Sequence, residues 1–219
     1  MVSLVDELLL LAYDDASGRN RAEHLEIGLG GAILLELTLT ERIDVVDKRV
    51  RVLDPSPTGD RLLDEVLRRL GEDKPRKPQA VVQRVSKGLR QTVLDDLVSR
   101  GVLRFERDRL LGVFPFHRYL PADPTAEADA RARLAAAVDA GTAPEARTAA
   151  LASLVYALRM HSVALPGRNQ REVRKALKAI SEGSWATDAT RKAVEAAQAA
   201  MMAAVMAAAT VSAGAAASG

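Results

Sequence analysis

Residues 81–120, VVQRVSKGLRQTVLDDLVSRGVLRFERDRLLGVFPFHRYL, combine a helical apolar pattern with the pattern of a β-hairpin. Apolar residues recur every three or four positions from Val81 to Val98, which predicts one helix of about twenty residues. Gly101 follows the last of them, and glycine at that position is typical of a helix end. The apolar runs 102–105 and 110–114 flank the polar segment 106–109, which predicts a hairpin that turns within that segment.

Positive charge is concentrated in the same part of the chain. From Lys74 to Arg118 there are eleven Lys or Arg and four Asp or Glu, a local charge of +7, so the rest of the chain carries −5 of the total of +2. A basic helix followed by a hairpin indicates an anionic partner, either nucleic acid or a membrane surface. The alternative is an ordinary solvated helix face with scattered cations.

Composition limits the class of protein. With 48% hydrophobic and 27% charged residues, 219 residues are enough for a globular domain with a real core. There is no cysteine, which excludes disulfides and thiolate metal sites and is compatible with a reducing cytoplasm. His24, His117 and His161 lack the spacing of metal ligands, so we expect no metal site. The N-terminus lacks the basic segment of a secretory signal, and the apolar run Ile27 to Leu35 is too short to span a bilayer.

The remaining patterns predict a mainly α fold in one domain, residues 1–211, with a flexible tail at 212–219. Helices are expected at 4–11, 22–39, 60–70, 125–140, 144–164 and 170–182, and a short hairpin at 43–52. The second helix is apolar nearly all round, which predicts a central position, and its Gly28 to Gly31 indicate close helix packing rather than a nucleotide loop. The Ala- and Met-rich helix that begins near Thr187 is expected to be buried and central.

Several of these segments resemble the Golgi phosphoprotein 3 family of peripheral membrane proteins that bind phosphatidylinositol 4-phosphate. The most specific match is PTGDRLLDEVL at residues 57–67, supported by LLLLA at 8–12, by the glycines and LEL of residues 28–39, and by LVSRGVL at 97–103. The resemblance runs from about Ser3 to Val211. It implies a single helical domain, with central apolar helices wrapped by amphipathic ones and a projecting β-hairpin at about 102–114.

The resemblance also implies a lipid head-group site. It places two pocket cations at Lys87 and Arg90, where charged donors would hold phosphate groups. The family's pocket also contains an arginine that falls on Gly30 here and a tryptophan that falls near Arg21. We therefore expect Arg19 or Arg21 to substitute. The expected head-group site comprises Lys87, Arg90, Arg19, Arg21 and Arg84.

The hairpin tip is the second expected contact. The resemblance assigns membrane contact or self-association to Arg107, Arg109, Leu110 and Leu111, with the leucines entering the membrane interface and the arginines meeting anionic lipids. It further implies cytoplasmic tails of membrane enzymes as partners, and a homo-oligomer through the hairpin. No enzyme motif or cofactor fingerprint is present, so we expect a cytoplasmic protein on a membrane surface, without catalytic activity or cofactor.

The alternative function is a winged-helix-like nucleic-acid-binding protein, because helix 81–100 and the hairpin together resemble a helix and wing. Few aromatic residues and no separate base-reading helix favour the membrane hypothesis. The Ala- and Arg-rich composition is typical of a high-GC bacterial source.

Overall fold

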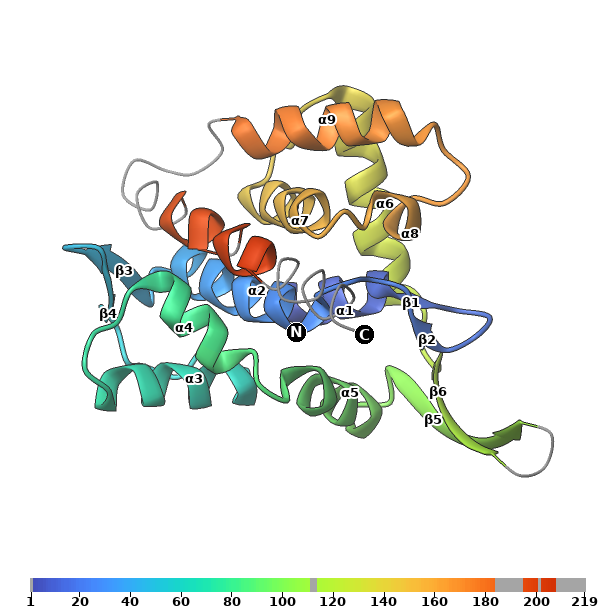
Figure 1. Ribbon diagram of the computed structural model, residues 1–219, viewed down its shortest axis with the longest axis horizontal. Coiled ribbons are helices and arrows are strands. Elements are labelled where there is room, and N and C mark those ends of the chain that lie inside the picture. The colour runs from blue at the N-terminus through green and yellow to red at the C-terminus, as the bar shows by residue number, and fades with distance from the viewer. Residues whose placement is uncertain (1, 111–113, 184–194, 201, 208–219) are drawn as a thin grey trace, which may run out of the picture.

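Two apolar helices, α1 (Leu4–Ala12) and α2 (Leu25–Leu39), lie at the centre of the molecule (Figure 1). The computed structural model describes residues 2–110, 114–183, 195–200 and 202–207, and only the backbone of 108–110 and 114–116. Within this part the protein is mainly helical with short two-stranded antiparallel hairpins. The predicted fold class is therefore confirmed.

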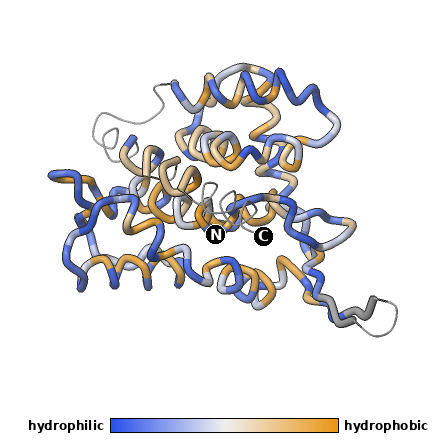
Figure 2. Tube along the Cα trace, viewed as in Figure 1, coloured by the Kyte–Doolittle hydropathy of each residue, from blue (hydrophilic) through white to orange (hydrophobic). Residues whose placement is uncertain are grey.

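The central helices owe their position to their composition. Every residue of α1 is buried, and its N-terminus is closed by a capping box in which Ser3 and Asp6 exchange hydrogen bonds between side chain and backbone. In α2 all residues from Gly28 to Thr38 are buried. Figure 2 shows hydrophobic residues concentrated along these two helices and on the inward sides of the helices around them.

Most of the other described helices form two groups on opposite sides of this centre (Figure 1). The first group comprises α3 (Arg61–Glu72), α4 (Pro78–Val85) and α5 (Leu89–Ser99). The second comprises α6 (Thr125–Ala140), α7 (Ala146–Ala157), α8 (His161–Ala164) and α9 (Gln170–Glu182). The predicted helix 144–164 is thus interrupted, since Arg159 adopts a positive φ of 55° between α7 and α8.

The predicted single helix 81–100 is wrong, because the chain turns between α4 and α5. Gly88 has a φ of +70°, a left-handed conformation that glycine adopts without steric cost and that ends one helix before the next begins. The apolar stripe continues through the break because both helices bury it: Val81, Val82, Leu89 and Val93 are all at most 3% exposed. The periodicity alone therefore does not reveal the turn.

In the part of the chain that the structure describes, three hairpins connect or extend the helices. They are β1 (Tyr13–Asp14) with β2 (Arg19–Asn20), β3 (Ile43–Val46) with β4 (Arg49–Val52), and β5 (Leu103–Leu110) with β6 (Phe114–Pro121). The third projects from the body (Figure 1). Its predicted turn at 106–109 is wrong, because these residues pair within β5 and Leu110 lies opposite Phe114. The polar residues 106–109 therefore belong to strand β5 and do not form the turn.

Residues 195–200 and 202–207 are also helical, but this segment is not the buried central helix that its composition predicts. Ala197, Ala200 and Ala204 are buried, whereas Met202 and Met206 are 40% and 57% exposed. The segment is anchored to α7 by a hydrogen bond of 2.9 Å that the Gln198 side chain donates to Ser153. It is an amphipathic helix on the surface. The predicted tail, 212–219, lies outside the described residues.

A network of ion pairs crosses the centre. Arg147 of α7 donates to Glu36 of α2 at 2.7 Å, to Glu7 of α1 at 3.2 Å and to the carbonyl of Val2 at 2.8 Å. Arg133 of α6 also donates to Glu7, at 2.7 Å. Glu36 in turn accepts a 2.6 Å hydrogen bond from the backbone N–H of Leu4. Acidic side chains inside apolar helices are thus paired, as buried charges require.

Another buried carboxyl, Glu127 of α6, gives the fold a pH dependence. Burial raises the pKa of Glu127 to about 7, opposed by Arg131 and reinforced by the nearby Asp15. Because this pKa exceeds the pKa of Glu127 in the unfolded chain, the folded state holds the proton more tightly. The resulting stabilisation is present in acid below the unfolded pKa and is lost as the pH rises through about 7.

Between about pH 5 and pH 8, the unfolding free energy of the parent protein should fall by about 1–3 kcal/mol more than that of Glu127→Gln, which lacks the titrating carboxyl. Urea unfolding of both proteins at several pH values measures this difference. Asp129→Asn, an exposed carboxyl on the same helix, is the control and should follow the parent. A constant difference between the parent and Glu127→Gln across this range would contradict the prediction.

Candidate functional site

A pocket of about 370 Å³ opens where the N-terminus of α2 meets the connection between α4 and α5. Lys87 and Arg90 line it from one side, together with Gln83 and Ser86. The facing side is formed by residues 20–27 except Arg21 and Glu23: Asn20, Ala22, His24, Leu25, Glu26 and Ile27. Two cations that the sequence indicates thus share one concave site.

The local backbone explains why these cations face the pocket. The turn at Gly88 places Lys87 in the connection after α4 and Arg90 in the first turn of α5, and both residues are exposed. On the facing side His24 precedes α2 with a positive φ of 53°. The side chain of Asn20 fixes the approach to this turn, since it donates to and accepts from the backbone of Ala22 at 2.9 Å.

Two helix N-termini add positive potential here. Neither His24 before α2 nor Gly88 before α5 provides a side-chain cap in the described structure. The N–H groups of Ile27 and Leu89 donate to the carbonyls of His24 and Ser86, at 3.0 and 3.2 Å, so the positive end of each helix is only partly satisfied by the backbone. The positive ends of helix dipoles favour anions, and together with two cations they make a site suited to phosphate. The carboxylate of Glu26 is the opposing charge in the lining.

The pocket is connected to the base of the projecting hairpin through α5. Burial raises the pKa of Tyr13, and the positive charge of Arg90 acts in the opposite direction. The ring of Tyr13 packs edge-on against Tyr119 of β6, with 6.1 Å between centroids. Gln91, the residue after Arg90, donates to the Tyr119 hydroxyl at 3.0 Å. The pocket-lining Arg90 and the residue that contacts the hairpin are therefore neighbours on the same helix.

The other expected head-group residues lie elsewhere. Arg84 lines a separate cavity between α3 and α4 and pairs with Asp73 at 3.2 Å. Arg19 and Arg21 are exposed on and after β2 and do not line the pocket as described. Hydrogen bonds from Ser17 are the main cause of the lowered pKa of Asp14, and the positive charge of Arg21 makes a smaller contribution in the same direction. The structure thus brings together two of the five expected residues.

The expected hairpin contact falls largely outside the described structure. Leu111 is not described, and Arg109 and Leu110 are described only as backbone of β5. Arg107 is exposed, with its guanidinium carbon 5.7 Å from the centre of the Phe105 ring. The proposed insertion of the two leucines therefore stays a prediction.

The glycines of α2 pack against neighbouring helices, as the sequence indicates. A Cβ atom added at Gly28 would lie 2.3 Å from the Leu158 side chain, and one added at Gly30 would lie 2.3 Å from the Ser86 hydroxyl and 3.0 Å from the Val82 carbonyl. The end of α4 therefore lies directly on Gly30. There is no room at this position for the arginine that the resemblance places there.

The family model for Golgi phosphoprotein 3 (GPP34) matches residues 4–197, nearly the whole chain. The chain belongs to the Golgi phosphoprotein 3 family. Vacuolar protein sorting-associated protein 74 of Eremothecium gossypii is similar to it, with 32% identity over 134 residues. That alignment covers 48% of this chain and 40% of the relative, so the chain matches less than half of the relative's length.

Membership of the Golgi phosphoprotein 3 family confirms the resemblance and agrees with the fold, while the source organism stays a prediction. No helix in the described ranges is both long and apolar enough to cross a membrane. Sequence reasoning missed the facing wall of the pocket, above all His24 and the uncapped start of α2. A lone histidine carries no local signal, and only the folded chain brings it near Lys87, more than sixty residues away.

Proposed function

We propose that this member of the Golgi phosphoprotein 3 family is a peripheral membrane protein that binds anionic phospholipid. The observation that carries the proposal is the pocket in which Lys87, Arg90 and the N-terminus of α2 converge. Charged donors and helix N-termini suit the phosphates of a phosphoinositide-like head group. The protein acts without catalysis, on the cytoplasmic face of a membrane.

The hairpin is the second contact in this proposal. Arg107 and Arg109 would meet anionic head groups and Leu110 and Leu111 would enter the interface, each cation contributing about 1 kcal/mol near the surface. Self-association through hairpins would strengthen weak single contacts by raising the effective concentration of the second one. Cytoplasmic tails of membrane enzymes are the proposed protein partners, for which the chain would be an adaptor.

Head-group recognition differs from the family pattern at two positions. Gly30 is covered by the end of α4 and carries no cation. Arg21 falls near the position at which the family has a tryptophan. The site therefore holds its ligand with fewer side-chain donors, and the backbone N–H groups of α2 and α5 carry a larger share. We expect the site to discriminate more strongly between anionic and neutral head groups than between phosphates at different positions of an inositol ring.

Sedimentation with liposomes tests the proposal. The protein should bind phosphatidylcholine vesicles that contain phosphatidylinositol 4-phosphate or phosphatidylserine, and not phosphatidylcholine alone. Lys87→Ala/Arg90→Ala should weaken binding roughly thirtyfold, since two cations contribute about 1 kcal/mol each. The readout is the bound fraction against lipid concentration.

The matched control is Arg171→Ala/Lys175→Ala, which removes the same charge from exposed positions of α9. If both double variants lose binding equally, general charge rather than the pocket is responsible. If Lys87→Ala/Arg90→Ala binds as well as the parent, the site is wrong. Salt-dependent binding to duplex DNA, with none to anionic vesicles, would replace the membrane function with the nucleic-acid alternative.

A further inference from the structure

A second cavity, of about 170 Å³, lies between α3 and α4 and is distinct from the pocket described above. Its interior is apolar. Val50 of β4, Val66 of α3, Val81 of α4 and Leu89 of α5 line it, and each is at most 5% exposed. Four elements thus contribute buried aliphatic side chains to one cavity.

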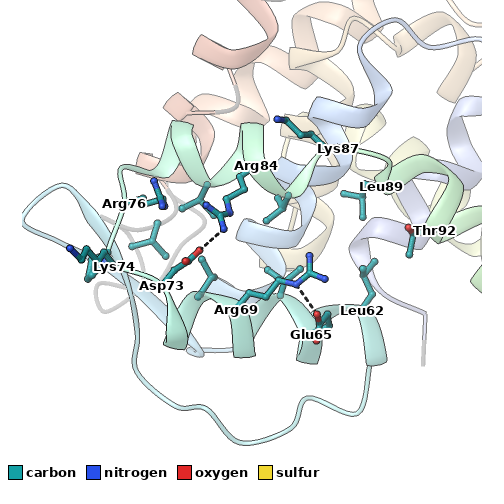
Figure 3. A pocket seen from close by; sticks show the side chains of 16 residues that line it. Leu62, Glu65, Arg69, Asp73, Lys74, Arg76, Arg84, Lys87, Leu89 and Thr92 are labelled. Carbon is teal, nitrogen blue, oxygen red and sulfur yellow. Dashed lines mark hydrogen bonds and ion pairs between the residues drawn. The ribbon is translucent and has the colours of Figure 1, made fainter.

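The rim of this cavity is cationic. Figure 3 shows Arg69 and Arg84 projecting from α3 and α4 into the space between the two helices. Each already pairs with one acid of α3 or its C-terminus, Arg69 with Glu65 at 2.7 Å and Arg84 with Asp73 at 3.2 Å.

Three further cations, Lys74, Arg76 and Lys87, line the same cavity, whereas Glu65 and Asp73 are its only acids in the described structure. The lining therefore carries a formal charge of +3 around an apolar interior. One of these acids is also shared, since Glu65 pairs with Arg68 as well, at 3.0 Å. The excess of cations favours a ligand that brings negative charge to the rim.

The volume limits the apolar part of such a ligand. Apolar cavities of about 150 Å³ in proteins accept benzene, so this one accommodates about six carbon atoms. We propose that the cavity between α3 and α4 binds a small amphipathic anion, with a six-carbon apolar group inside and a carboxylate or phosphate between Arg69 and Arg84. The guanidinium groups bind such heads through paired N–H donors.

This inference is independent of the proposed lipid pocket. Lys87 lines both sites, but Arg90 lines only the lipid pocket and Arg84 only the cavity. Arg90→Ala should therefore weaken vesicle binding and leave the cavity ligand unaffected. Arg84→Gln should weaken binding of the cavity ligand and leave the vesicle binding that depends on Arg90 unaffected. The two proposals can therefore fail separately.

Titration with heptanoate and hexyl phosphate, followed by NMR of labelled Val and Leu methyl groups, tests the proposal on the full chain. Both share a six-carbon chain and differ in the anionic head. We expect at least one of them to shift the methyl signals of Val66, Val81 and Leu89. Acetate lacks the apolar part and heptan-1-ol lacks the charge, so both should bind at least about tenfold more weakly. Phosphatidylglycerol vesicles form a separate arm: shifts caused by vesicles would assign a membrane source, and shifts caused only by the free anions a soluble one.

Two substitutions locate the site. Arg84→Gln should weaken binding about tenfold, because it removes one charge-assisted contact. Its control, Arg61→Gln, removes an 85% exposed cation outside the cavity and should bind like the parent. Leu62→Phe, at a half-buried lining position, should fill the cavity and abolish binding.

The methyl shifts of the parent protein decide the proposal even if Leu62→Phe does not fold. Absence of shifts with both anions and with vesicles overturns it. Shifts confined to other methyl groups, equal binding of heptan-1-ol, or unchanged binding by Arg84→Gln would also overturn it.

Discussion

Replacing Arg147 with alanine should lower the free energy of unfolding by about 3–5 kcal/mol. Arg147 bridges Glu7 and Glu36, which are 4% and 8% exposed, and also binds the carbonyl of Val2. The substitution leaves two acidic side chains in the core with fewer partners, and an uncompensated buried charge is far more costly than a lost surface pair. Urea unfolding followed by circular dichroism measures the loss.

Two further variants separate this mechanism from loss of packing. Arg171→Ala, at an exposed position, should change the unfolding free energy by less than about 0.5 kcal/mol. Adding Glu36→Gln to Arg147→Ala should recover part of the loss, because the amide removes one of the unpaired charges. If the double variant is less stable than Arg147→Ala by the full cost of Glu36→Gln alone, the two side chains are not coupled and the bridge has no energetic role.

Local patterns predicted much of this fold correctly. Asp60 caps α3 by accepting from the backbone N–H groups of Leu62 and Leu63, at 2.8 and 3.1 Å, as expected for an Asp before an apolar helical run. The hairpin of β3 and β4 turns at Asp47 and Lys48, both with positive φ. α6 ends at Gly141 and α9 spans its predicted residues. In each case the residues that determine the feature are close in the sequence.

Other features depend on residues that are distant in the sequence, and these were not predictable from local patterns. The partners of Glu7 are 126 and 140 positions away, so the sequence shows only an acid within an apolar run. That anomaly was nevertheless a usable signal, since a buried acid requires a cationic partner. The candidate site follows the same rule: Lys87 and Arg90 were predictable together, but the N-terminus of α2 that completes their pocket was not.

Replacing Gly30 with arginine should lower the free energy of unfolding by about 3 kcal/mol or more. Added side-chain volume in a packed core costs about 1–3 kcal/mol, and a buried guanidinium adds a desolvation cost of several kcal/mol, against about 1 kcal/mol gained from replacing a helical glycine. Even the Cβ atom would meet the Ser86 hydroxyl at 2.3 Å and the Val82 carbonyl at 3.0 Å. Urea unfolding measures the change.

The smaller substitution Gly30→Ala isolates the contact with α4. Combining it with Ser86→Ala removes the closest atom, so the pair should be more stable than the sum of the single changes predicts, although the Val82 carbonyl still prevents full recovery. Gly28→Ala is the matched control, because the three atoms nearest to its Cβ all belong to the Leu158 side chain, which is more flexible than a backbone carbonyl. If Gly30→Arg instead keeps its stability and binds anionic vesicles more tightly, the end of α4 can move away from α2. The pocket would then admit the family's arginine, and close packing at Gly30 would not be what limits the lipid site.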